Sequence, residues 1–178
     1  NFGDNAYRTD KSRYDRNFRY TGLFPTPSVG EGRTLWLHFE GVNRKGTVRL
    51  NGHQLGHLDG FMQPGDYDIT RLVAPGGENR LEVEVEWVGY PVPNFRSPTY
   101  ISSAGWDWMP YAPGLLSGIT DDVYLSLSGD VRLVEPWVRT KVPDREHAKV
   151  ELLTDVENHA DKACEGVLRG EIRPGGIA

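Results

Sequence analysis

The sequence has little cysteine, no excess of positive charge and no long apolar run. Its only cysteine among 178 residues is Cys164, so an internal disulfide and a thiolate metal cluster are both excluded. A single cysteine is compatible with either the cytoplasm or the periplasm. The formal net charge of −5 gives no general attraction to phosphate backbones or to anionic lipid. We therefore expect no nucleic-acid partner.

Membrane insertion is not expected either, because no stretch approaches the roughly 18 consecutive apolar residues of a spanning helix. The chain starts Asn1-Phe2-Gly3-Asp4, without an initiator methionine or a signal peptide, so we expect a processed or internal N-terminus. By contrast, glycine (21) and proline (12) are plentiful and spread along the chain, and 38% of the residues are hydrophobic. This composition is typical of a globular, turn-rich fold.

Apolar residues occupy every second position in three segments, which predicts β-strands with one buried face. The alternating residues are Leu35, Leu37 and Phe39; Leu81, Val83, Val85 and Trp87; and Val123, Leu125 and Leu127. Asn51-Gly52 between two further runs is a strong hairpin signal, because both residues tolerate positive φ. No segment keeps a helical period; the nearest is a turn at 68–73 that Asp68 could cap. The sequence predicts an all-β sandwich.

The organisation changes near residue 130. The segments 131–142, interrupted at Pro136, 148–157 and 163–172 are each interpreted as a strand. Three strands cannot close an immunoglobulin-type sandwich, which takes about seven. We therefore expect one domain over residues 1–130 and a truncated second domain over residues 131–178.

The segment 90–114 is the candidate functional loop, since it is long, rich in proline and aromatic residues, and lies between two predicted strands. Trp106 and Trp108 would share one face of an extended chain, with Asp107 on the other. Indole rings stack on the C–H faces of sugars, and a carboxylate accepts hydrogen bonds from hydroxyl groups. The same residues also suit a core plug in which Asp107 binds backbone amides. Residue types alone leave both interpretations open.

Other candidate sites have simpler explanations. His53 and His57 are four residues apart, but on a hairpin rather than a helix, so a metal site is not expected. The row of glutamates at 82, 84 and 86 fits a solvated strand face, and Asp121-Asp122 fits a turn, better than an acid/base pair. The sequence has no phosphate-binding loop and no Gly-x-Ser-x-Gly elbow. We expect no cofactor and no catalytic triad.

Four segments in order, 33–43, 48–56, 67–70 and 79–85, resemble the N-terminal sugar-binding domain of glycoside hydrolase family 2. Residues 105–110 and 117–125 are similar to the loop and returning strand of the β-mannosidase and exo-β-glucosaminidase branches. Residues 131–178 resemble the opening of the immunoglobulin-like domain that follows. The resemblance covers roughly residues 13 to 173. Met109 and the Thr120-Asp121 pair depart from the family pattern, which argues against a mannosidase in particular.

The resemblance implies a jelly-roll, galactose-binding-like sandwich over residues 1–130 and a partial immunoglobulin-like sandwich over 131–178. It also implies a (β/α)₈ barrel further along the same polypeptide, which would hold the two catalytic glutamates of a retaining mechanism. Neither glutamate lies in this chain, so no catalytic residue is assigned and the chain alone is expected to be inactive. Asp107, with Trp106 and Trp108 beside it, matches a family contact to the sugar at the barrel mouth. A polysaccharide-processing role favours a periplasmic or secreted location.

Two alternatives remain open. A free-standing carbohydrate-binding module would bind sugar at its own loops, without a barrel. A purely structural tandem of β-sandwiches would keep both tryptophans in the core. The sequence does not set the preferred sugar, because the barrel residues that select it are absent.

Overall fold

The structure is a computed structural model that describes residues 8, 10–13, 16–43, 45–60, 63–87 and 118–173. Apart from a 3-10 turn at Lys11–Arg13 (η1), the elements in these ranges are β-strands, which confirms the all-β prediction. The chain divides into two compact units, Asn1–Gly30 with Thr34–Leu127, and Glu31–Arg33 with Ser128–Ala178. No helix in the described ranges has the length and hydropathy needed to cross a membrane.

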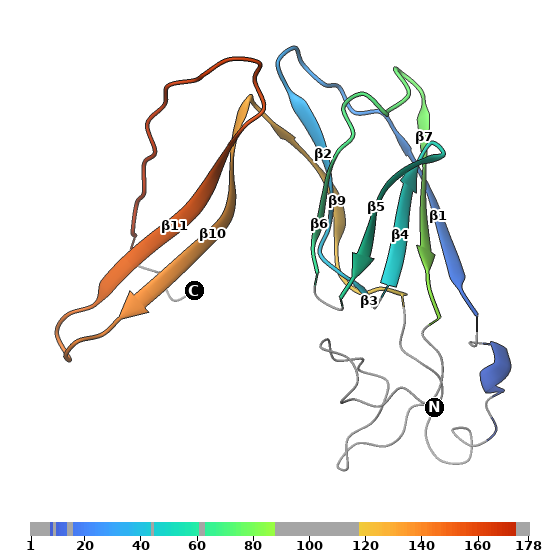
Figure 1. The fold of residues 1–178 in the computed structure, drawn as a ribbon, viewed down its shortest axis with the longest axis horizontal. Helices are drawn as coiled ribbons and strands as arrows, with labels where there is room; N and C mark the ends of the chain where they lie inside the picture. The colour runs from blue at the N-terminus through green and yellow to red at the C-terminus, as the bar shows by residue number, and fades with distance from the viewer. Residues whose placement is uncertain are drawn as a thin grey trace. The chain divides into compact units, whose positions relative to one another are not determined.

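The first unit is built from antiparallel strands in separate sheets (Figure 1). The four-stranded sheet has the order β1 (Phe18–Pro25), β7 (Glu78–Val85), β4 (Lys45–Leu50) and β5 (His53–Asp59). The three-stranded sheet has the order β6 (Gly65–Asp68), β2 (Thr34–Phe39) and β9 (Val123–Ser128). A short pair joins β3 (Val42–Asn43) to β8 (Gly118–Ile119).

One hydrophobic core joins the two larger sheets. The predicted apolar faces of β2 and β7 are buried, with Phe39 at 1% and Val83 at 2% exposure. They pack with Val48 and Leu50 of β4, which are fully buried. Burying such a side chain stabilises the fold by about 1.5–3 kcal/mol. Because residues of both sheets share this cluster, the unit is a β-sandwich.

The predicted local signals at two turns are confirmed. Asn51 and Gly52 both have positive φ, 50° and 85°, and join β4 to β5 as a tight hairpin. At the 68–73 turn, the Asp68 carboxylate accepts a hydrogen bond from the Thr70 amide at 2.9 Å. The Val73 amide donates to the Ile69 carbonyl at 3.2 Å, which closes one helical turn.

The prediction of a buried face for β9 was wrong. Val123, Leu125 and Leu127 are 37%, 36% and 46% exposed. The physical reason is packing: within the described chain no residue of β9 belongs to the core cluster or packs against it. Trp87 lies just beyond the end of β7 and is likewise 38% exposed.

The second unit contains an antiparallel hairpin of β10 (Val131–Lys141) and β11 (Lys149–Asn158). The ladder pairs Val134 with Asp155 and Trp137 with Leu153, so two residues of β10 oppose one of β11. This β-bulge confirms the interruption predicted at Pro136, which cannot donate to a ladder.

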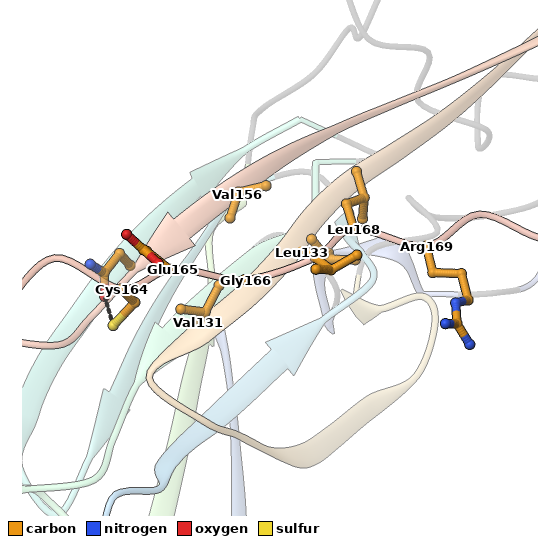
Figure 2. A pocket seen from close by; sticks show the side chains of 10 residues that line it. Val131, Leu133, Val156, Cys164, Glu165, Gly166, Leu168 and Arg169 are labelled. Carbon is orange, nitrogen blue, oxygen red and sulfur yellow. Dashed lines mark hydrogen bonds between the residues drawn. The ribbon is translucent and has the colours of Figure 1, made fainter.

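The prediction of a third strand at 163–172 was wrong. The segment has no strand pairing in the described chain and instead runs along the hairpin. Gly166 and Gly170 weaken the intrinsic preference for an extended strand. Figure 2 shows Leu168 of this segment beside Leu133 of β10.

Candidate functional site

The predicted site residues Trp106, Asp107 and Trp108 lie outside the described residues, as does the whole of 88–117. The structure describes the residues that come directly before and after this segment, and the strands that hold them. We call these residues the base of the segment.

Two hydrogen-bonded positions, two residues apart along the chain, hold the two ends of the base. Asn43 of β3 pairs with Gly118 of β8, the first described residue after the segment. The carbonyl of Lys45, which starts β4, accepts a hydrogen bond of 3.0 Å from the amide of Glu86. Residues 43 and 45 can be at most about 7 Å apart. The two ends therefore lie close together at one end of the sandwich (Figure 1).

Side chains fix the entry end. The Trp87 amide donates to Asn17 Oδ1 at 2.9 Å, and Asn17 Nδ2 donates to Glu84 Oε1 at 3.3 Å. The hydrogen bonds from Asn17 and Arg19 hold the pKa of Glu84 below its ordinary value. Glu84 is therefore ionised at neutral pH and can keep Asn17 oriented towards the backbone of Trp87.

Backbone bonds fix the return end. The Thr120 amide donates to the Gly41 carbonyl at 3.1 Å, and the Glu40 amide donates to the Asp122 carbonyl at 3.0 Å. Gly118 has φ of +146°, a conformation that residues with a Cβ rarely adopt. These contacts fix the course of the backbone from β8 into β9.

The sequence analysis missed a polar chain that crosses the three-stranded sheet. His38 of β2 lies 2.8 Å from Asp66 Oδ1 through Nδ1, and 2.7 Å from Ser126 Oγ through Nε2. Its side chain is 13% exposed. The order Asp66–His38–Ser126 is that of a catalytic triad. However, Ser126 lies within a regular strand rather than on the sharp turn that presents a nucleophile. We therefore interpret these hydrogen bonds as contacts that hold the three strands together.

The glutamates of β7 lie on a charged strand face, as predicted. Glu84 Oε2 lies 3.2 Å from Arg19 and 3.7 Å from Arg49, so the glutamate face of β7 is an ion-pair network. His57 Nδ1 lies 3.2 Å from Thr47 Oγ1 on a neighbouring strand. Exposed pairs of this kind contribute little stability and form no acid/base dyad.

The described residues define a two-sheet β-sandwich in which the residues before and after segment 88–117 lie close together. The chain belongs to the family described as glycosyl hydrolase 2 galactose-binding domain-like, whose model matches residues 1–120. This confirms the resemblance found in the sequence.

The chain is similar to a part of two longer relatives. It is 33% identical to an exo-β-D-glucosaminidase of Arthroderma benhamiae, over 96% of this chain and 19% of that protein. It is 22% identical to β-mannosidase B of Aspergillus clavatus, over 81% of this chain and again 19% of that protein. The chain thus spans about a fifth of the length of these relatives.

Two solved structures share the fold. An exo-chitosanase of Amycolatopsis orientalis, solved with PNP-β-D-glucosamine, matches at a TM-score of 0.71 and 25% identity. That match covers 90% of this chain and 18% of the other. A β-D-mannosidase of Dictyoglomus thermophilum matches at a TM-score of 0.66 and 24% identity, over 88% and 21%.

Proposed function

We propose that this chain is the non-catalytic N-terminal portion of a family 2 glycoside hydrolase, and that it lends the loop around Asp107 to the enzyme's sugar pocket. In this proposal residues 1–130 are the jelly-roll domain and 131–178 begin the immunoglobulin-like domain. Family membership and the 19% coverage of the exo-β-D-glucosaminidase support a place inside a longer enzyme.

The observation that carries the loop's role is its base. The pairs Asn43–Gly118 and Lys45–Glu86 bring both ends of residues 88–117 to one edge. A scaffold that fixes both ends of a long loop is how binding residues are usually positioned. Asp107 would accept hydrogen bonds from sugar hydroxyls or an amine, and Trp106 and Trp108 would supply apolar surface.

Bond cleavage is assigned to another part of the polypeptide. A retaining mechanism needs one carboxylic acid to protonate the leaving oxygen and a carboxylate to attack the anomeric carbon. In this proposal a (β/α)₈ barrel provides both, and the N-terminal loop orients the non-reducing sugar between them. Orientation of this kind lowers the entropic cost of reaching the transition state.

The test compares the polypeptide of the full reading frame with the 178-residue chain. Both are assayed with p-nitrophenyl β-glucosaminide and p-nitrophenyl β-mannoside, and the stereochemistry of the product is followed by NMR. We expect the full polypeptide to cleave at least one substrate with retention, and the short chain to cleave neither. Hydrolysis by the short chain would overturn the non-catalytic role. A full reading frame that ends near residue 178 would favour the free-standing module instead.

A further inference from the structure

The two faces of the β10–β11 hairpin differ in chemistry. Ladder partners share a face, and alternate residues of each strand share it too. One face is apolar and carries Val131, Leu133, Val138, Val150, Leu152 and Val156. Residues 164–169 line a groove of about 670 Å³ along part of it (Figure 2). This apolar face is the one suited to a sandwich core.

The opposite face is charged. Arg132 Nε lies 2.6 Å from Glu157 Oε2, and Arg139 Nη2 lies 2.8 Å from Glu151 Oε2. Trp137 stands on this face with 59% of its surface exposed. Its ladder partner is Leu153, and the two ion pairs lie on either side of it along the strands. An exposed indole offers an apolar ring face to a ligand.

The β-bulge builds a concavity beside this indole. Glu135 adopts φ of 50°, which is uncommon for a residue with a Cβ, and Pro136 follows it. The resulting hollow of about 410 Å³ is lined by Glu135, Pro136, Trp137, Leu153, Thr154 and Asp155. Its volume is in the range of small-ligand sites.

A guanidinium restricts the indole of Trp137 on one side. The Arg139 guanidinium carbon lies 5.0 Å from the centroid of the Trp137 ring, within cation–π range. Arg139 is itself held by its ion pair with Glu151 at 2.8 Å. A side chain ordered in advance loses less conformational entropy when it binds.

Two carboxylates in the lining are available to a ligand. Glu135 and Asp155 flank the hollow, and neither side chain has a hydrogen bond or an ion pair with the described part of the protein. Carboxylates only accept hydrogen bonds, and they attract a cation. An indole, by contrast, favours an apolar ring face. A hexose that bears a protonated amine satisfies both preferences at once.

We propose that the hollow at Trp137 is a second carbohydrate site, and that it binds a protonated amino-sugar unit of an oligosaccharide. Trp137 stacks on the pyranose ring, while Glu135 and Asp155 bind the ammonium group. The site belongs to the second compact unit and does not depend on the loop around Asp107. It would hold a polymeric ligand without taking part in cleavage.

The test uses two tetrasaccharides that differ only in the amine. Calorimetric titration of the full chain compares β-1,4-linked glucosamine tetramer with cellotetraose, which has a hydroxyl in place of each amine. We expect the glucosamine tetramer to bind more tightly. Trp137→Ala should weaken its binding about tenfold or more, and Trp137→Phe should restore part of it. The double variant Glu135→Gln/Asp155→Asn should remove the preference over cellotetraose.

A control separates this site from other surfaces. Trp87→Ala removes a half-exposed indole of the other unit and should leave the affinity unchanged. Loss of binding in Trp87→Ala, or no effect of Trp137→Ala, would overturn the second site. Absence of binding to both tetrasaccharides would also overturn it and would assign the face to protein contacts. None of these results bears on hydrolysis by the full polypeptide.

Discussion

The imidazole of His38 stacks on the phenol ring of Tyr124, with centroids 4.6 Å apart and 16° between the planes. The Tyr124 hydroxyl in turn donates to Glu40 Oε1 at 2.9 Å. Stacking and hydrogen bonding thus link β2 to β9, the strand that continues from the return end of the 88–117 segment. The edge position of β9 makes these side-chain contacts important for holding it.

The first prediction concerns the ionisation of Tyr124. The hydrogen bond to Glu40, together with partial burial, raises the pKa of Tyr124 above its ordinary value. A raised pKa means that the contact stabilises the fold below the ordinary tyrosine pKa and loses this contribution as the pH rises through the raised value. Burial raises the pKa of Tyr67 as well, so ultraviolet titration should show more than one late tyrosine. One late component should be absent in Tyr124→Phe and shifted downward in Glu40→Gln. An unchanged titration in Glu40→Gln would contradict the assignment.

A buried amide should be one of the most sensitive positions in the first unit. Asn79 is fully buried, and its Oδ1 accepts hydrogen bonds from Asn51 Nδ2 at 2.9 Å and from the Ala74 amide at 2.8 Å. Its Nδ2 donates to Thr26 Oγ1 at 2.8 Å. Asn79→Ala leaves these groups without their partner and should cost about 2–3 kcal/mol. Urea denaturation measures this cost.

The control for Asn79 is its neighbour in the same strand. Glu78 is exposed, so Glu78→Gln should change the free energy of unfolding by less than about 0.5 kcal/mol. Equal effects of the two substitutions would show that the amide network does not hold the turns around Asn51 and Ala74.

Two strand glycines offer a matched test of packing. A Cβ at Gly46 would lie 2.7 Å from Val42 Cγ1 in the core, whereas a Cβ at Gly22 would meet nothing within 4 Å. Gly46→Ala should therefore destabilise the unit by about 1–3 kcal/mol. Gly22→Ala should be neutral or stabilise by up to about 1 kcal/mol, since it restricts the unfolded chain. Thermal unfolding of both variants checks the pair, and the reverse order of stability would refute the close approach at Gly46.

Local patterns predicted much of this fold. Leu35, Leu37 and Phe39 are buried as their alternation indicated, because strands in the middle of a sheet have one face on the core. Asn51-Gly52 forms its turn because the preference is local to two residues. The same reasoning failed for Leu125 and for residues 163–172, where the outcome depends on which strands lie alongside.

The polar arrangements could not be predicted in the same way. His38 meets Asp66 and Ser126 from 28 and 88 residues away, and only the sheet order brings the three together. Trp137 did have a sequence signal, since a proline within an alternating strand indicates a bulge that re-aims the next side chain. Whether Trp106, Asp107 and Trp108 meet a sugar stays a prediction, because these residues lie outside the described part of the chain.

The most direct test of the account is the activity of the full polypeptide carrying Asp107→Ala. Loss of a carboxylate that binds the sugar should lower kcat/KM by about 10- to 100-fold, while the unfolding midpoint stays unchanged. Asp130→Asn, an exposed position near the junction of the two units, is the control and should keep full activity. We expect kcat/KM to fall in Asp107→Ala and not in Asp130→Asn. An unchanged kcat/KM in Asp107→Ala would contradict a role for this loop in the sugar pocket.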